Sequence, residues 1–180
     1  MTFVRCLHTD IDVEHVWQEV CSVHHFATFA RIKPVHDFAI NYRHQLSYTA
    51  PTANFDYDAG IGNVSKQVSK SCTVLVDPLR GSYTESILGR YKGYHRWRLV
   101  RYNLRSQPTI NDIIDQANLD KVYRIIIPIK CFGATALVGN QKHEIKLGSS
   151  YIVNTSNKRN LEIIDIKYHN NLYIVGEHIL

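Results

Sequence analysis

Histidine is the residue type in this chain that most directly suggests metal chemistry, because ten are present among 180 residues. Imidazole is a common metal ligand, and two ligands close in sequence place two donors on one element. The chain has no HxH or HExxH spacing, and its single HxD is His8-Thr9-Asp10 near the N-terminus. Its adjacent pair, His24 and His25, lies in a predicted helix, where neighbouring side chains point about 100° apart. Local spacing therefore does not predict a metal site.

Motifs for covalent or nucleotide chemistry are also missing from the sequence. There is no GxSxG elbow to present a serine nucleophile and no GxxxxGK[ST] loop to hold phosphates. The four cysteines form no CxxC pair, so neither a zinc ribbon nor a redox dithiol is indicated. We interpret them as reduced thiols of a cytoplasmic protein.

The strongest chemical signal is a basic and aromatic stretch over residues 89–105 (GRYKGYHRWRLVRYNLR), which contains no acidic residue. Arginines mixed with aromatic rings along a strand can track phosphates and stack bases, so nucleic-acid binding through residues 90–105 is one alternative. Alternate residues of a strand share a face, which puts Arg96 and Arg98 on one side and Arg101 on the other. Some of these arginines must therefore point inward and pair with acids or a small anionic ligand.

Two helices are expected among the elements that position these side chains. Apolar residues recur every three or four positions near the N-terminus and predict an amphipathic helix over Asp12–Phe26, packed on the outside of the fold. The segment Ser82–Arg90 predicts a short second helix, with Ser82 or Thr84 as its cap.

The rest of the chain predicts strands, because after residue 37 the spacing changes to period two in β-branched and aromatic runs bounded by turn residues. We expect about eight antiparallel strands between Phe38 and Val175, forming a sandwich or barrel. The runs are Gln45–Thr49, Cys72–Val76, Trp97–Tyr102, Val122–Ile129, Thr135–Val138, His143–Leu147, Tyr151–Asn154, Glu162–Tyr168 and Leu172–Val175.

Length and composition favour one globular domain, since 180 residues with 44% hydrophobic and 21% charged side chains suffice for a single core. We divide it into an N-terminal helical extension, residues 1–36, and a β core, residues 37–180. No segment has the roughly 18 apolar residues of a membrane helix, and no signal peptide is indicated, so a cytoplasmic protein without a membrane partner is expected.

From Asp37 onward, the order of segments resembles the aspartyl/asparaginyl beta-hydroxylase-like family of 2-oxoglutarate and iron oxygenases. The matching segments are HQLSYTA followed by DYDAG, then RGSYTESILGRY, HRWRLVRYNLRSQPTINDIID, VYRIIIPI, HEIKLGSSYIVNTSN and LYIVGEH. The resemblance implies a mainly β fold, the double-stranded beta-helix or cupin-like jelly roll, with an N-terminal helix and a short second helix.

The resemblance also indicates where iron ligands would lie, and this chain departs from the family pattern there. The carboxylate of the family's HxD motif is kept as Asp115, while its histidine is replaced by Ile113. Residues 158–160 (KRN) occupy the region of the second histidine, and the cosubstrate arginine falls on Asn171. Iron needs a set of such ligands facing open coordination positions. The resemblance thus implies a protein that has kept the fold and lost the iron chemistry, with no catalytic residue and no cofactor.

The residues expected to bind a ligand in the old pocket are polar and mostly cationic, namely Arg98, Arg101, Asp115, Arg124 and Asn154. Arginine forks suit carboxylates and phosphates. We therefore predict a binding or regulatory protein for a small anionic ligand or an acidic protein segment. Because a buried arginine stays charged, it needs an anion beside it, and Asp115 or a bound ligand is the expected partner.

Two other interpretations of these residues remain open. The arginines and Asp115 can form a network that only satisfies a buried polar face. Alternatively, the protein is an active hydroxylase that uses Fe(II) and 2-oxoglutarate with an atypical metal site, for which the candidate ligands are Asp115, His143 and His169.

Overall fold

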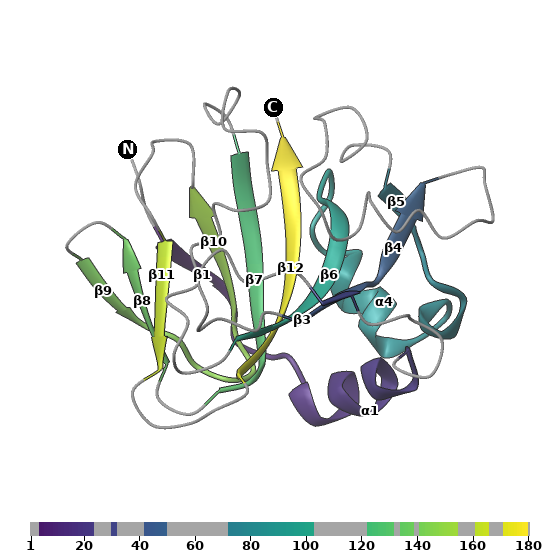
Figure 1. The fold of residues 1–180 in the computed structure, drawn as a ribbon, viewed down its shortest axis with the longest axis horizontal. Helices are drawn as coiled ribbons and strands as arrows, with labels where there is room; N and C mark the ends of the chain where they lie inside the picture. Colours follow the sequence, from purple (N-terminus) through teal and green to yellow (C-terminus); the bar gives the residue numbers. More distant parts are fainter. Residues whose placement is uncertain are drawn as a thin grey trace.

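A computed structural model describes residues 4–23, 30–31, 42–49, 72–102, 122–131, 134–138, 141–154, 161–165 and 171–179. Its largest element is a seven-stranded sheet in the order β1-β10-β7-β12-β6-β3-β2, with β12 at its centre (Figure 1). In that order the strands are Val4–His8, Ser150–Asn154, Val122–Lys130, Asn171–Ile179, His95–Tyr102, Tyr42–Gln45 and Ala30–Arg31.

Two smaller sheets accompany the large one. The first has the order β11-β8-β9, with bounds Leu161–Asp165, Ala134–Val138 and Gln141–Glu144, and the second pairs β4 (Ser47–Thr49) with β5 (Cys72–Leu75). All strand pairs in the described part of the chain are antiparallel, as the sequence predicted.

The strand predictions differ from the structure in number and in several boundaries. Ten strands, rather than about eight, follow residue 37 in the described part of the chain, and β12 continues past the predicted end at Val175 to Ile179. Two strands, β1 and β2, lie before residue 37, where only a helix was expected. The run Gln45–Thr49 is divided between β3 and β4 at Leu46, whose N–H donates to Trp97 O and whose carbonyl accepts from Val76 N, so the chain passes from one sheet to another there. The run His143–Leu147 is a strand only as far as Glu144.

Helix α1 (Val13–Val23) packs on one face of the seven-stranded sheet. Val16 and Val20, two of the positions at helical spacing, are fully buried in the core cluster that also contains Ile125 and Ile127 of β7. Residues 24–26 of the predicted helix lie outside the described residues. Among the described residues, no helix is long and apolar enough to cross a membrane.

The second helix, α4 (Tyr83–Leu88), follows a 3-10 turn, η1 (Asp77–Leu79), and its predicted cap Ser82 is confirmed. The Ser82 hydroxyl accepts from Glu85 N at 3.0 Å. Thr84, the other predicted cap, is buried inside the helix and instead donates its hydroxyl to Glu19.

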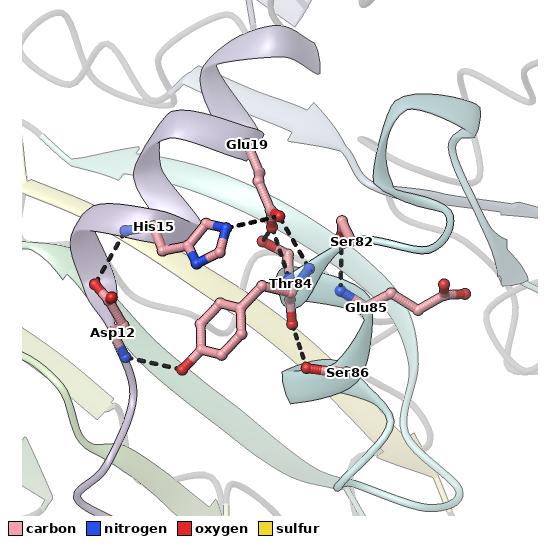
Figure 2. Close-up of polar contacts among 8 residues, drawn as sticks. Asp12, His15, Glu19, Ser82, Thr84, Glu85 and Ser86 are labelled. Carbon is pink, nitrogen blue, oxygen red and sulfur yellow. Dashed lines mark hydrogen bonds and ion pairs between the residues drawn. The ribbon is translucent and has the colours of Figure 1, made fainter.

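Glu19 of α1 binds the first turn of α4 and so joins the two helices (Figure 2). One carboxylate oxygen accepts from Tyr83 N at 2.9 Å, and the other accepts from the N–H and hydroxyl of Thr84 at 2.7 and 2.6 Å. His15 lies 3.3 Å from the same carboxylate and stacks on the Tyr83 ring. Burial acts to raise the pKa of Glu19, but the hydrogen bonds from Thr84 and Tyr83 outweigh it and lower that pKa below its usual value.

Glu19→Gln should lower the free energy of unfolding by about 1 kcal/mol at pH 7, as expected for the loss of a helix-capping carboxylate. Because the folded-state pKa of Glu19 is lowered, its contribution is complete above the ordinary glutamate pKa and is lost as pH falls through the lowered value. Urea unfolding at pH 7 and pH 3 should therefore show a smaller difference between variant and wild type at pH 3. Glu14→Gln, on the exposed side of α1, is the control, and equal losses at both pH values would contradict the assignment.

A β-bulge lies where β6 meets the end of β12. Val175 and Glu177 pair with Arg98 and His95, so two residues of β6 stand opposite Gly176 alone. The extra residue of the bulge is Arg96, which adopts a left-handed backbone with φ 51°. The Trp97 ring packs directly on Gly176, with no room for a β-carbon between them.

Gly176→Ala should therefore destabilise the protein by about 2 kcal/mol, because its methyl group would overlap the Trp97 ring in an already filled core. Chemical unfolding followed by tryptophan fluorescence measures both the loss and the displacement of the ring. Gly89→Ala is the matched control, since Gly89 has φ −62°, which suits alanine, and a change below about 1 kcal/mol is expected there. Equal effects of the two substitutions would rule out the close packing as the cause.

Candidate functional site

The candidate site is built on the three central strands β6, β12 and β7, on the sheet face away from α1. Register places Glu177 of β12 beside Arg124 of β7, and Val175 beside Arg98 of β6. Directly paired residues share a face, so Arg98, Arg124 and Glu177 lie on the same side. The alternate positions, including Leu99, Ile125 and Ile174, belong to the core that packs against α1.

Three arginines surround the carboxylate of Glu177, and all four side chains have no exposed surface. Arg98 Nη2 donates to Glu177 Oε1 at 2.5 Å, and Arg96 Nη1 donates to Oε2 at 3.3 Å. Arg124 Nε lies 3.8 Å from Oε1 and contributes an ion pair rather than a hydrogen bond. We call these four residues the arginine cluster.

The bulge in β6 helps to assemble the arginine cluster. Arg96 and Arg98 were predicted to share a face, and both do contact Glu177. A left-handed conformation costs a non-glycine residue of order 1 kcal/mol. The buried ion pair between Arg96 and Glu177 is an interaction that can hold this strained conformation in place.

Electrostatics keep Glu177 ionised. Burial acts to raise the pKa of its carboxyl, but Arg98, Arg96 and Arg124 outweigh burial and lower the pKa to about 2. Arginine does not lose its proton in proteins. The cluster therefore holds three positive charges around one negative charge at neutral pH.

Arg98 has unused donor capacity. Its Nη2 contacts Glu177, whereas its Nε and Nη1 are buried and have no hydrogen-bond partner among the described residues. A buried donor without a partner costs about 1–3 kcal/mol and more when it is charged. Such a group is what an anion-binding site presents before its ligand arrives.

The sequence-predicted site residues fall into three groups. Arg98 and Arg124 are brought together, and the anion beside them is Glu177, which the sequence analysis did not name as a site residue. Arg101 lies on β6 and Asn154 on β10, with only their backbone described. Asp115 lies outside the described residues. The signal for Glu177 was available, because it is a lone acid in the apolar strand LYIVGEHIL.

The alternative metal ligands are only partly described. His143 lies on β9, with a buried Nε2 that has no hydrogen-bond partner among the described residues, while Asp115 and His169 fall outside them. Among the described side chains, no three of His, Cys, Asp or Glu are grouped so as to hold a metal ion.

The basic stretch offers little of its charge to a nucleic acid over the residues whose side chains are described. Arg96 and Arg98 are fully buried, and Arg90 is held by Asp10 through two hydrogen bonds of 3.0 and 3.1 Å. Its aromatic members Tyr91, Tyr94 and Trp97 pack on one another. These three arginines are therefore buried or already paired, and they do not form an exposed basic surface.

Comparison with known proteins supports the fold. No family model matches the chain, and no curated protein matches it. Among solved structures, it is similar to an oxidoreductase of the 2OG-Fe(II) oxygenase family from Burkholderia pseudomallei, with TM-score 0.52 and 10% identity over 98% of this chain and 84% of that one. It is also similar to a prolyl-4-hydroxylase from Pseudomonas putida, with TM-score 0.47 and 7% identity over 99% of this chain and 93% of that one.

The fold prediction is thereby confirmed. The chain is mainly β, with antiparallel sheets and two α-helices in its described part, and it has the jelly-roll or double-stranded beta-helix architecture of 2OG-Fe(II) oxygenases. At 10% identity the similarity concerns the fold alone.

Proposed function

We propose that this protein is a binding or regulatory protein that uses an oxygenase fold to hold a small anion without iron-dependent hydroxylation. The observation that carries the proposal is Arg98, a fully buried cation with two donor nitrogens that have no partner among the described residues. The order of sequence segments supports placing the chain beside the aspartyl/asparaginyl beta-hydroxylase-like branch of this fold. Arg98 and Arg124 are the central ligand-binding residues, with Arg101, Asp115 and Asn154 as further contributors.

The charges on this face of the sheet do not suit iron. A ferrous ion needs carboxylate or imidazole ligands that are free to coordinate it. The described acid here is Glu177, and its two oxygens are already held by Arg98 and Arg96. A divalent cation would also be repelled by three guanidinium groups. The arginine cluster therefore fits an anion and does not fit a metal ion.

The ligand is proposed to be a small carboxylate- or phosphate-bearing molecule, or the acidic end of a protein segment. Guanidinium groups bind both anions through paired donors of fixed geometry. The four side chains of the cluster have no solvent-exposed surface, and burial strengthens any charged contact made there.

Metal analysis and anion titration of the wild-type protein test the proposal. We expect purified protein to carry less than stoichiometric iron after reconstitution and to bind acetate, succinate, 2-oxoglutarate or phosphate in calorimetry, with sodium chloride at equal ionic strength as the control. One bound iron per chain together with conversion of 2-oxoglutarate to succinate would overturn the proposal and favour the hydroxylase with Asp115, His143 and His169. Binding of single-stranded DNA but of no small anion would overturn it in favour of residues 90–105.

A further inference from the structure

Glu177 is held in the way that proteins hold a bound carboxylate. Separate guanidinium groups contact its two oxygens, Arg98 at Oε1 and Arg96 at Oε2, and Arg124 adds a third positive charge. A carboxylate with no exposed surface and a pKa of about 2 carries a full negative charge in this place. The chain thus supplies one anion to its own arginine cluster.

The remaining capacity of the cluster lies on Arg98. A guanidinium has five N–H donors in one plane, and contact with Glu177 through Nη2 leaves Nε and Nη1 without a partner among the described residues. A planar carboxylate matches such an edge with two parallel hydrogen bonds. A second anion bound there would lie close to Glu177 and would be repelled by its negative charge.

We propose that Glu177 is a specificity-determining residue that lowers the affinity of the arginine cluster for doubly charged ligands relative to singly charged carboxylates. This inference rests on the proposed function and adds the effect of ligand charge to it. A second charge on the ligand is repelled by Glu177, whose side chain has no exposed surface, and this repulsion offsets part of the attraction to the three arginines. The cost of removing an ion from water also rises steeply with its charge. Dicarboxylates and phosphate dianions therefore bind less well, relative to singly charged carboxylates, than they would without Glu177.

The same reasoning predicts what happens when Glu177 is removed. Glu177→Ala opens the position of one carboxylate between Arg96 and Arg98 without changing the donors around it. Free formate or acetate should then occupy that position and restore stability by mass action. Glu177→Gln keeps the shape and removes the charge, so it should shift selectivity toward doubly charged ligands.

Chemical rescue of Glu177→Ala is the direct test. Its melting temperature is measured against formate and acetate, with chloride at the same ionic strength as reference and Asp10→Ala, which removes the exposed partner of Arg90, as the matched variant. We expect a saturable rise with formate and acetate for Glu177→Ala that exceeds the rise for wild type, whereas the rise for Asp10→Ala should be no larger than that for wild type. Equal responses to carboxylates and chloride would overturn the inference.

Glu177→Gln keeps the inference testable if the alanine variant does not fold in any salt. We expect its affinity for succinate relative to acetate to exceed the wild-type ratio by about tenfold, and an unchanged ratio would overturn the inference. The two proposals fail in different ways. Wild-type protein that binds no anion refutes the proposed function, while carboxylate rescue of Glu177→Ala would still show that Glu177 occupies an anion position.

Discussion

Glu177→Gln is expected to lower the free energy of unfolding by about 3–5 kcal/mol, the usual cost of removing one partner from a buried ion pair. The glutamine amide has nearly the same shape, so the loss reports charge rather than packing. The substitution leaves Arg96, Arg98 and Arg124 buried without the carboxylate that they share. Equilibrium unfolding in urea at pH 7 measures the difference.

The pH dependence of that difference provides a second measurement of the same charge. The folded-state pKa of Glu177 is lowered to about 2, below the unfolded value of about 4.3. Its stabilisation is therefore complete above the unfolded pKa and is lost as pH falls from there through about 2. The stability of wild type and Glu177→Gln should converge in acid. Asp10→Asn, at an exposed pair, should cost less than about 1 kcal/mol, and a comparable loss there would contradict the assignment.

Arg98→Met is expected to weaken anion binding by about 100-fold, because it removes charge-assisted hydrogen bonds worth about 1.5–3 kcal/mol each. Its effect on stability should be much smaller than that of Glu177→Gln. Arg96 and Arg124 still pair with Glu177 after the substitution. Removing the Arg98 charge also relieves its repulsion with these two arginines, and the methionine side chain fills most of the space that Arg98 occupied. Calorimetric titration and urea unfolding on the same preparation separate the two effects.

The matched control for Arg98→Met is Arg90→Met, which removes an arginine held by an exposed partner. It should change neither anion affinity nor stability by more than about 1 kcal/mol. If Arg98→Met destabilises the protein as much as Glu177→Gln while wild type binds no anion, the arginine cluster is a structural network. That outcome would favour the interpretation, left open by the sequence, that these residues only satisfy a buried polar face.

Much of the fold followed from local sequence patterns. The period-two runs after residue 37 and the three- and four-residue spacing before it were sufficient for the strands and for α1, because these periods reflect one buried face. Strand β2 was not anticipated, since Ala30–Arg31 is too short to show a period. Strand β1 was not anticipated either, because Arg5, Cys6 and Leu7 are all exposed and show no buried face. The join at Leu46 was not visible either, because it depends on hydrogen bonds to Trp97 and Val76, which are far away in the sequence.

The candidate site was predictable only in part, because it too depends on contacts between segments that are far apart in the sequence. Strand alternation placed Arg96 and Arg98 on one face, and buried arginines require a nearby anion. Asp115, which lies outside the described residues, or a ligand was expected as this anion. The structure places Glu177 beside the arginines through the register between β12 and β7. Register between strands that are about 50 residues apart is a tertiary property that no local pattern contains.

The central place of β12 also constrains how the protein can be made. The strand order sets β12 between β7 and β6, although it is the last of the described strands to leave the ribosome. Until then, β7 and β6 have no partner on those edges, and the three arginines have no Glu177 to neutralise them. A nascent chain that has synthesised everything up to residue 170 should therefore remain sensitive to protease, and resistance should appear in a single step once β12 has emerged.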